Sequence, residues 1–370
     1  MNRSTHWPDL RRREFHHILI VKPSSLGDVI HAFPVLHGLR TRYPKAKIDW
    51  LISTPFAPLL QGHSDLDEVL PFDRSLYSRV VSNPKAAVAF LRFLRNLQRQ
   101  RHDLVVDLQG LFRSGFLSFA SRAPVRIGFS DSREGAWLFY THRIPRGEIN
   151  VHAVDRNYRV ARILGFEDVP VEFPMAVRSE AKAQVESFLK PTMIGESLGP
   201  LVGVVPGARW ETKMWSPERF SRVIDRIHGD HSARVVLLGG SGDVSLCEKI
   251  AADCSVPALN LAGQTTLDQL VAAIDRCDLV LCQDSAAAHI AAGLGRPLVC
   301  LVGPTNPHRT GPYKRFQDVV RHDVECSPCY LRRLSQCPHE QKCMSDLEVD
   351  RVVEAVSERI RGFKPLTTKK

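Results

Sequence analysis

Short apolar runs that alternate with helix-like stretches are the feature that most limits how this chain can fold. In the first half, they predict strands at 18–21, 48–53 and 102–110 and helices at 29–43 and 84–99. In the second half, they predict strands at 201–205, 234–239, 279–282 and 297–302, and helices at 216–227, 242–252, 266–276, 286–294 and 346–361. This alternation is typical of parallel sheets covered by helices, so we predict an α/β fold.

The alternation of strand-like and helix-like segments is interrupted in "FLKPTMIGESLGP", residues 188–200, which holds two prolines and two glycines. With 370 residues, two domains are expected rather than one. We predict a basic tail at 1–16, an N-terminal domain at 17–190, a linker at 191–200 and a C-terminal domain at 201–370. Three capping sequences mark helix starts in the C-terminal domain: Ser216-Pro217, Thr266-x-x-Gln269 and Ser345-x-x-Glu348.

The formal net charge of +10 suggests an anionic partner, or simply a solvated basic surface. Nucleic acid, an anionic membrane face and phosphorylated small molecules all fit this charge. No RNA-binding or zinc-finger signature supports nucleic acid. No apolar run reaches the roughly 18 to 20 residues of a membrane span, and the polar, basic N-terminus predicts no secretory signal. We therefore expect a cytoplasmic protein.

The stretch "VKPSSLGDVIHAFP" places Asp28 in the connection between the first predicted strand and the helix that follows it. Spacing alone favours a capping role, because a carboxylate in a first turn opposes the positive end of the helix dipole. The alternative is a general base, since a carboxylate is ionised at neutral pH and can accept a hydroxyl proton.

Two loops of the second half point to phosphate binding. In "VVPGARWETKMWSPERF", Arg209 and Lys213 precede a helix start, where cations are unfavourable unless an anion binds; two solvated bases are an equal alternative. In "LVLCQDSAAAHIAAGLGRPLVCLVGPTNP", Asp284 could hold a ribose hydroxyl while the backbone of Ser285 and Ala286 meets a diphosphate. His289 follows in the same helix.

A capping aspartate and a core histidine would also explain the last of these loops. Three such loops at corresponding strand ends nevertheless favour a nucleotide-diphosphate site. Neither half carries a G-x-G-x-x-G or G-x-x-x-x-G-K-[ST] sequence, which argues against a dinucleotide oxidoreductase and a P-loop ATPase.

Four of the nine cysteines, Cys326, Cys329, Cys337 and Cys343, fall within eighteen residues. Their spacing fits a structural site with four sulfur ligands for zinc or iron, with no catalytic role. The alternative is four reduced surface thiols, or a disulfide only if the protein is exported. The other five cysteines lie in apolar or helical stretches and are expected to be reduced core residues.

Several motifs in order give the chain a family resemblance: "VKPSSLGDVIHAFPVL", "DLQGLFRS", "SREGAWLFY", "HAVDRNYRV", "TKMWSPE" and "DSAAAHIAAGLGRPLVCLVGPTNP". Over about residues 18–313 it resembles the glycosyltransferase family 9 heptosyltransferases, most closely the heptosyltransferase I branch. The resemblance implies a GT-B fold, two doubly wound domains facing across a cleft. It also implies inverting, metal-independent transfer of heptose from ADP-heptose to Kdo of lipid A.

The resemblance also implies roles for single residues. Asp28 matches the proposed base, Lys213 the lysine on the donor phosphates, and Asp284, Ser285 and His289 the D-[ST]-x-x-x-H donor motif. On the acceptor side, the matches are Gln109 and Gly110 in the "QGL" loop, Arg133 in "SREGA", and Arg113, which sits where a basic residue of that loop often lies. The basic charge would meet anionic Kdo–lipid A and hold the enzyme at the inner membrane face.

Two other interpretations stay open. The same fold could act on another acceptor: the first core heptose, another glycan or an autotransporter protein. The cysteine cluster resembles clusters of the heptosyltransferase II-like and protein-heptosylating branches, so the acceptors of those branches remain alternatives. A thiol–metal or nucleic-acid-binding module is a third interpretation, but it leaves the three rim loops without a role.

Overall fold

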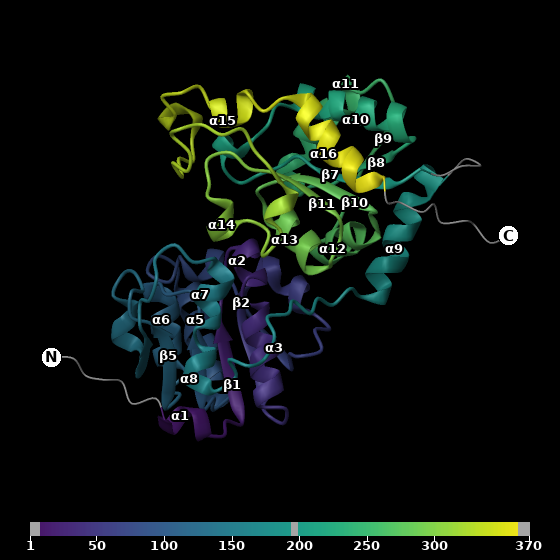
Figure 1. Cartoon of the computed structure of the whole chain (residues 1–370). Coiled ribbons are helices and arrows are strands. Elements are labelled where there is room, and N and C mark those ends of the chain that lie inside the picture. The colour runs from purple at the N-terminus through teal and green to yellow at the C-terminus, as the bar shows by residue number, and fades with distance from the viewer. Residues whose placement is uncertain (1–7, 194–198, 362–370) are drawn as a thin grey trace. The chain divides into compact units, whose positions relative to one another are not determined.

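The computed structural model describes residues 8–193 and 199–361, and the chain divides by its internal contacts into two compact units. The N-terminal unit ends at Ala176 and the C-terminal unit begins at Val177. Each unit is built on its own six-stranded sheet, and every pair of neighbouring strands in both sheets is parallel (Figure 1). This confirms the predicted α/β class.

The N-terminal sheet has the strand order β3-β2-β1-β4-β5-β6. Its strands are β1 (His17–Val21), β2 (Lys47–Ser53), β3 (Glu68–Phe72), β4 (Leu104–Asp107), β5 (Val125–Phe129) and β6 (His142–Ile144). Its helices are α1 (Pro8–Arg12), α2 (Leu26–Ile30), α3 (Phe33–Arg42), α4 (Arg74–Tyr77), α5 (Pro84–Arg99), α6 (Phe112–Ala120), α7 (Ala153–Tyr158) and α8 (Ala161–Leu164), with 3-10 turns η1 (Thr54–Leu60) and η2 (Ala136–Phe139).

Alternate residues of these strands meet different helices. Leu19 and Val21 of β1 join one apolar cluster with Leu97 of α5 and Leu117 of α6. Trp50 of β2 packs on the other side, where its ring lies 6.0 Å from that of Phe33 in α3. Because both faces are covered, most residues of the central strands are apolar rather than alternating, with the buried Asp49 of β2 and Asp107 of β4 as exceptions.

The C-terminal sheet has the order β12-β11-β10-β7-β8-β9, which is the same winding read from the other edge. Its strands are β7 (Leu201–Val205), β8 (Arg234–Leu237), β9 (Ala258–Asn260), β10 (Leu279–Gln283), β11 (Leu298–Leu301) and β12 (Val319–Val320). Its helices are α9 (Ser179–Leu189), α10 (Pro217–His231), α11 (Val244–Asp253), α12 (Leu267–Arg276), α13 (Ala286–Gly293), α14 (Pro307–Thr310), α15 (Lys342–Ser345) and α16 (Val349–Ile360), with a 3-10 turn η4 (Glu211–Lys213).

One apolar cluster of this unit joins the sheet to α10, α11 and α16. On the other side, α12 and α13 pack against the strands so closely that a Cβ on Gly203 of β7 would lie 2.7 Å from the sulfur of Cys277. Figure 1 shows these two helix layers on opposite faces of β7 and β10.

The division between units falls earlier than the predicted linker at 191–200. The reason is α9, which packs against α12 within the C-terminal unit: Gln269 donates to Gln184 at 2.7 Å, and Arg276 pairs with Glu186 at 2.7 Å. Residues 194–198 of that linker, and residues 1–7 of the predicted tail, lie outside the described residues. No helix in the described part of the chain is long and apolar enough to cross a membrane.

Local predictions held where capping residues act as expected. Thr266 with Gln269 forms the capping box of α12. Ser216 is the N-cap residue of α10 and Pro217 its first residue, as predicted, but the Ser216 side chain makes no capping hydrogen bond. The box expected at Ser345 is wrong, because that hydroxyl bonds Asp346 and α16 begins only after Glu348. The helix expected at 29–43 is two helices, α2 and α3, since Pro34 starts a new helix after the break at 31–32.

Candidate functional site

The strand order of each sheet identifies one edge where ligands are expected. In both units the winding reverses between two central strands, β1 and β4 in one sheet and β7 and β10 in the other. Loops leaving the carboxyl ends of such strands diverge and form a crevice, the usual ligand site of open α/β sheets. Asp28 and Gln109 follow β1 and β4, and Lys213 and Asp284 follow β7 and β10.

Three loops of the N-terminal unit meet at this edge. The backbone N–H of Ser24, after β1, faces the side-chain oxygen of Gln109 at 3.4 Å. The N–H of Arg133, after β5, donates to the carbonyl of Gly110 at 2.9 Å. The structure therefore brings together the loops that carry Asp28, Gln109 with Gly110, and Arg133.

Asp28 caps the helix in which it sits. One carboxylate oxygen accepts from the N–H of Ser25 at 3.0 Å and from its hydroxyl at 2.7 Å. This confirms the capping role that spacing favoured. The residue is half-buried, so it also reaches solvent at the edge where the three loops meet. Its role as a base stays a prediction.

Lys22, which sequence reasoning passed over, is the buried cation of this edge. Its ammonium donates to the carbonyl of Leu108 at 2.9 Å. Burial lowers its pKa, an effect that the nearby charges of Asp28 and Asp107 oppose. The signal was present in "VKPSS", where a cation directly follows a buried strand.

The "QGL" turn is held from beneath by Asp107. One of its oxygens accepts from the N–H groups of Gln109 and Gly110 at 2.9 and 3.1 Å, and the other accepts from the hydroxyl of Tyr140 at 2.8 Å. Gly110 has φ +66°, a conformation that glycine adopts without strain. Arg133 is exposed beside this turn, and Arg113 is exposed in the first turn of α6.

In the C-terminal unit, the predicted donor residues Lys213 and Asp284 bind each other. The Lys213 ammonium lies 2.7 Å from a carboxylate oxygen of Asp284 and 3.2 Å from its carbonyl, and it also lies 4.5 Å from the centre of the Trp210 ring. Both side chains are largely buried. The hydroxyl of Thr305, in the "GPTNP" loop, donates to the same carboxylate oxygen. Three loops thus converge on one buried ion pair.

The helix that follows Asp284 presents its first turn at this edge. Ser285 is the N-cap residue of α13 and Ala286 its first residue. The buried hydroxyl oxygen of Ser285 has no hydrogen-bond partner within the described part of the chain. His289 is 8% exposed and belongs to the buried side of α13. Arg209 stands apart from this group, because it is exposed on the loop after β7.

A cysteine-rich segment, residues 326–343, braces two loops of the C-terminal unit, the one that carries Lys213 and the one that carries Gly303. The side-chain amide of Gln341 faces the carbonyls of Glu211, Thr212 and Met214 at 3.3, 2.9 and 2.8 Å. On the other loop, the Ser327 hydroxyl donates to the carbonyl of Gly303 at 2.7 Å. The loop that carries Lys213 therefore depends on this segment for its shape.

The four thiols of this segment influence one another. Burial raises the pKa of Cys343 to about 11, and the charges of Cys329, Cys326 and Cys337 act in the same direction. Their sulfurs do not form a group within 4.8 Å of one another in the described residues. The donor set is right for zinc or iron, but tetrahedral ligation would require the sulfurs to move closer together.

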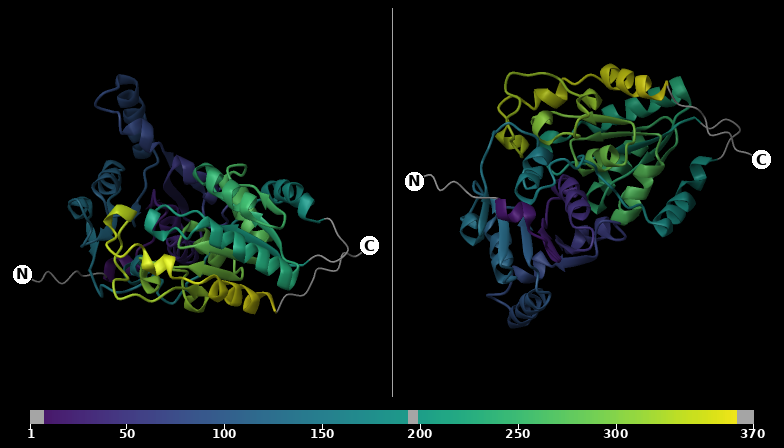
Figure 2. Two further views of the ribbon diagram at one scale, coloured as in Figure 1. Left: turned by 90° about the horizontal axis from the view of Figure 1, so that it is seen from above. Right: turned by 60° about the horizontal axis from the view of Figure 1, so that its bottom comes forward.

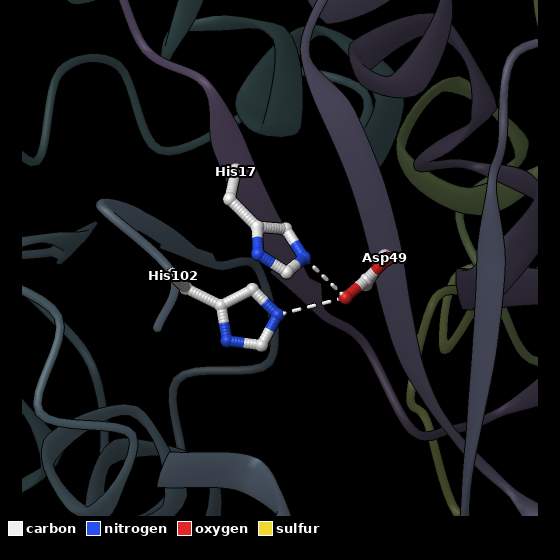
Figure 3. A group of neighbouring side chains, drawn as sticks. All are labelled: His17, Asp49 and His102. Carbon is white, nitrogen blue, oxygen red and sulfur yellow. Dashed lines mark hydrogen bonds and ion pairs between the residues drawn. The ribbon is translucent and has the colours of Figure 1, made fainter. Parts of the chain in front are cut away.

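A different group in the described residues does place three metal-type ligand atoms within 4.8 Å: His17, Asp49 and His102 (Figure 3). One oxygen of Asp49 faces the Nε2 atoms of His17 and His102 at 2.7 and 2.9 Å. The hydrogen bonds of both histidines hold the pKa of Asp49 at about 2 despite its burial, and burial lowers the pKa of His102. The group joins the amino-terminal ends of β1 and β4 to β2, away from the ligand edge.

The sequence profile described as "Glycosyltransferase family 9 (heptosyltransferase)" matches residues 90–339, more than half of the chain. The chain belongs to glycosyltransferase family 9. Among curated family members, it is 28% identical to "Lipopolysaccharide core heptosyltransferase OpsX" of Haemophilus influenzae, over 91% of this chain and 94% of that protein. It is 29% identical to "Lipopolysaccharide heptosyltransferase 1" of Pseudomonas aeruginosa, over 88% and 89%.

Solved structures of glycosyltransferase family 9 share the fold. A family member from Veillonella parvula superposes with a TM-score of 0.83 at 22% identity, covering 95% of this chain and 99% of that one. The Escherichia coli heptosyltransferase WaaC, solved with ADP, gives 0.71 at 23% identity, covering 93% and 99%. The protein is therefore a glycosyltransferase with the GT-B fold, as the sequence motifs implied.

Proposed function

We propose that this enzyme transfers heptose from ADP-heptose to Kdo of the lipid A inner core, with inversion at the anomeric carbon and without a catalytic metal. The observation that carries the proposal is the Lys213–Asp284 pair at the winding reversal of the C-terminal sheet, 2.7 Å apart and largely buried. The relatives named above are lipopolysaccharide heptosyltransferases, and one structural neighbour was solved with ADP.

On the donor side, Lys213 would neutralise charge on the departing diphosphate. An ammonium has three N–H donors, and two directions are used here by the carboxylate and carbonyl of Asp284. The third N–H of the same nitrogen can donate to a phosphate oxygen while the bonds to Asp284 remain. The backbone N–H groups that open α13 at Ser285 and Ala286 would meet the same diphosphate, since helix N-termini favour anions.

On the acceptor side, Asp28 would serve as the general base. The acceptor hydroxyl attacks the anomeric carbon, the new C–O bond forms as the bond to ADP breaks, and the hydroxyl proton passes to Asp28. Gln109, Gly110, Arg113 and Arg133 would bind the anionic acceptor beside it. Positioning of both substrates can contribute about 7 to 11 kcal/mol, which makes it the largest expected contribution.

The remaining features fit a cytoplasmic enzyme at the inner membrane face. The net charge of +10 suits an anionic glycolipid surface. The four cysteines would bind a structural zinc or iron ion that fixes the segment bracing the Lys213 loop. That ion would have no part in the transfer itself.

The decisive experiment replaces Asp28 with asparagine. Asparagine can still accept the hydrogen bonds of Ser25, so the helix cap persists while the base is lost. With ADP-heptose and Kdo₂-lipid A, wild-type protein should release ADP, and Asp28→Asn should reduce turnover by about 10² to 10⁴-fold while ADP binding stays intact. A variant that keeps a tenth of wild-type activity would rule out Asp28 as the base.

The acceptor is tested in parallel, because one of the relatives bears the name of an OpsX core enzyme and the other that of heptosyltransferase 1. The same assay with a lipid A core that already carries its first heptose, another glycan or an autotransporter protein would detect a different acceptor. Transfer to one of these acceptors, with none to Kdo₂-lipid A, would show that this acceptor is the enzyme's substrate and that Kdo of lipid A is not.

A further inference from the structure

The segment from α4 to the end of α5 carries charge of one sign only. Between Asp73 and Asp103 the sequence has seven basic residues and neither Asp nor Glu: Arg74, Arg79, Lys85, Arg92, Arg95, Arg99 and Arg101. None of the seven forms an ion pair with any residue in 8–193 or 199–361. Their charge therefore remains available to an anionic partner.

Exposed aliphatic side chains lie among these cations. Val81, in the turn before α5, is 98% exposed, and Val88 and Leu91 of α5 are 56% and 53% exposed. Val88, Leu91, Arg92, Arg95 and Arg99 recur at helical spacing on one side of α5. We call this side, together with Val81 and Lys85, the basic face.

The opposite side of α5 fixes the orientation of the basic face. Phe93 packs against Phe72 of β3 at 5.5 Å and against Tyr77 of α4 at 5.4 Å, measured between ring centres. Leu97 is buried in the same cluster. Because that side is held by the core of the N-terminal unit, the helix cannot turn its exposed valine and leucine inward.

Exposed phenylalanines also lie on α6, which packs against α5. Phe112 and Phe119 of α6 are 54% and 55% exposed, and Phe116 between them stacks with Phe90 of α5 at 6.5 Å. In both views of Figure 2, the α4–α5 segment projects from the sheet of the N-terminal unit. Cations, aliphatic groups and phenylalanines thus occupy neighbouring helices at one periphery of this unit.

We propose that the basic face seats the N-terminal unit on a bilayer of anionic lipid. Exposed aliphatic side chains interspersed with cations are typical of helices that lie in the membrane interface, whereas nucleic acid would need the cations alone. Val81, Val88 and Leu91 enter the headgroup region, and the arginines meet lipid phosphates. The inference deepens the proposed function, since a lipid-linked acceptor lies in such a surface, but it can be measured without donor or transfer.

The test is co-sedimentation of the full chain with vesicles of phosphatidylglycerol and phosphatidylethanolamine, against vesicles of phosphatidylcholine alone. Each cation near an anionic surface changes binding by about fivefold, so Arg92→Glu with Arg95→Glu should weaken binding by at least about 25-fold. The control, Arg222→Glu with Arg351→Glu, reverses two exposed charges of the C-terminal unit and should change binding little. At about 0.5 M salt, where charge is screened, the remaining binding should fall further in Val88→Ser with Leu91→Ser.

Three results would overturn this inference: equal binding to anionic and neutral vesicles, equal loss in the control pair, or binding to a polyanion such as heparin without binding to vesicles. The Arg92 and Arg95 variant should keep the far-ultraviolet circular dichroism spectrum and the urea unfolding curve of wild type, which verifies that its N-terminal unit is folded. Failure of the proposed function appears differently, as absence of ADP binding or of transfer to detergent-dispersed acceptor while vesicle binding persists.

Discussion

Replacing Gln341 with methionine isolates the brace between the cysteine-rich segment and the Lys213 loop. Methionine has nearly the length of glutamine but no N–H group, so the change removes hydrogen bonds with little change in volume. The side-chain amide of Gln341 faces three carbonyls of residues 211–214, at 3.3, 2.9 and 2.8 Å. An amide nitrogen has two N–H groups, so the two shorter contacts carry most of the interaction.

The size of the effect follows from those two bonds. Each is worth about 1 kcal/mol, so the Lys213 loop loses about 2 kcal/mol of its preference for the observed conformation. If ADP binds only that conformation, its apparent affinity falls with the fraction of molecules that keep it. The dissociation constant for ADP should then rise by up to about 30-fold, since 1.4 kcal/mol corresponds to tenfold.

Isothermal titration of ADP into the purified variants measures this change. Gln336→Met is the matched control, because Gln336 lies in the same segment but its side chain accepts bonds only within it, from Arg332 and Arg333 at 3.2 Å. We expect the control to bind ADP like wild type. Binding of ADP by Gln341→Met within twofold of wild type, or an equal loss in Gln336→Met, would refute the role of the brace.

Three further predictions concern charge and metal. Lys213→Met leaves the buried Asp284 carboxylate without its ion pair and should lower the free energy of unfolding by about 3 kcal/mol and abolish measurable ADP binding, whereas the exposed Arg209→Met should cost under about 0.5 kcal/mol in urea titration. The pKa of Asp49 is lowered to about 2 in the folded state, so ionised Asp49 stabilises the fold by about 2 kcal/mol at any pH above the ordinary carboxyl pKa. This stabilisation is lost as the pH falls from about 4 to 2. In denaturation series over that range, the stability advantage of wild type over Asp49→Asn should shrink by the same amount. The lowered pKa of His102 acts in the same sense from pH 6.5 downward, because the unfolded state takes up that proton first. Elemental analysis after anaerobic preparation should find zinc or iron in wild type and less in Cys326→Ser; absence of both from wild type contradicts a structural metal.

Much of the fold could be predicted because it is encoded locally. Continuous apolar runs predicted β1, β2, β7 and β10, since strands covered on both faces have no polar side. The three-residue strands β6 and β9 were missed, because such short segments show no period. The break between α2 and α3 was also missed, because apolar spacing continues across it although Pro34 starts a new helix.

The sequence singled out candidate site residues, but it did not indicate which of them contact one another. Asp28, Lys213 and Asp284 were singled out because each is a charged residue in a segment where a buried strand is followed by a helix. Lys213 and Asp284, which pair with each other, are 71 residues apart in the sequence. The hydrogen bonds of Gln341 span 127 to 130 residues. Contacts at such separations depend on how the loops are folded over the sheet, for which a single sequence carries no periodic signal.

The two sheets share no strand, although they follow the same winding. If the N-terminal unit binds the acceptor and the C-terminal unit binds ADP, as proposed above, new loops on the first sheet can change the acceptor without disturbing the strands of the second. Chimeras that join the first half of one enzyme of this kind to the second half of another should keep both hydrophobic interiors whole. Under the proposed division of roles, the acceptor could differ between such enzymes while the nucleotide site stays the same.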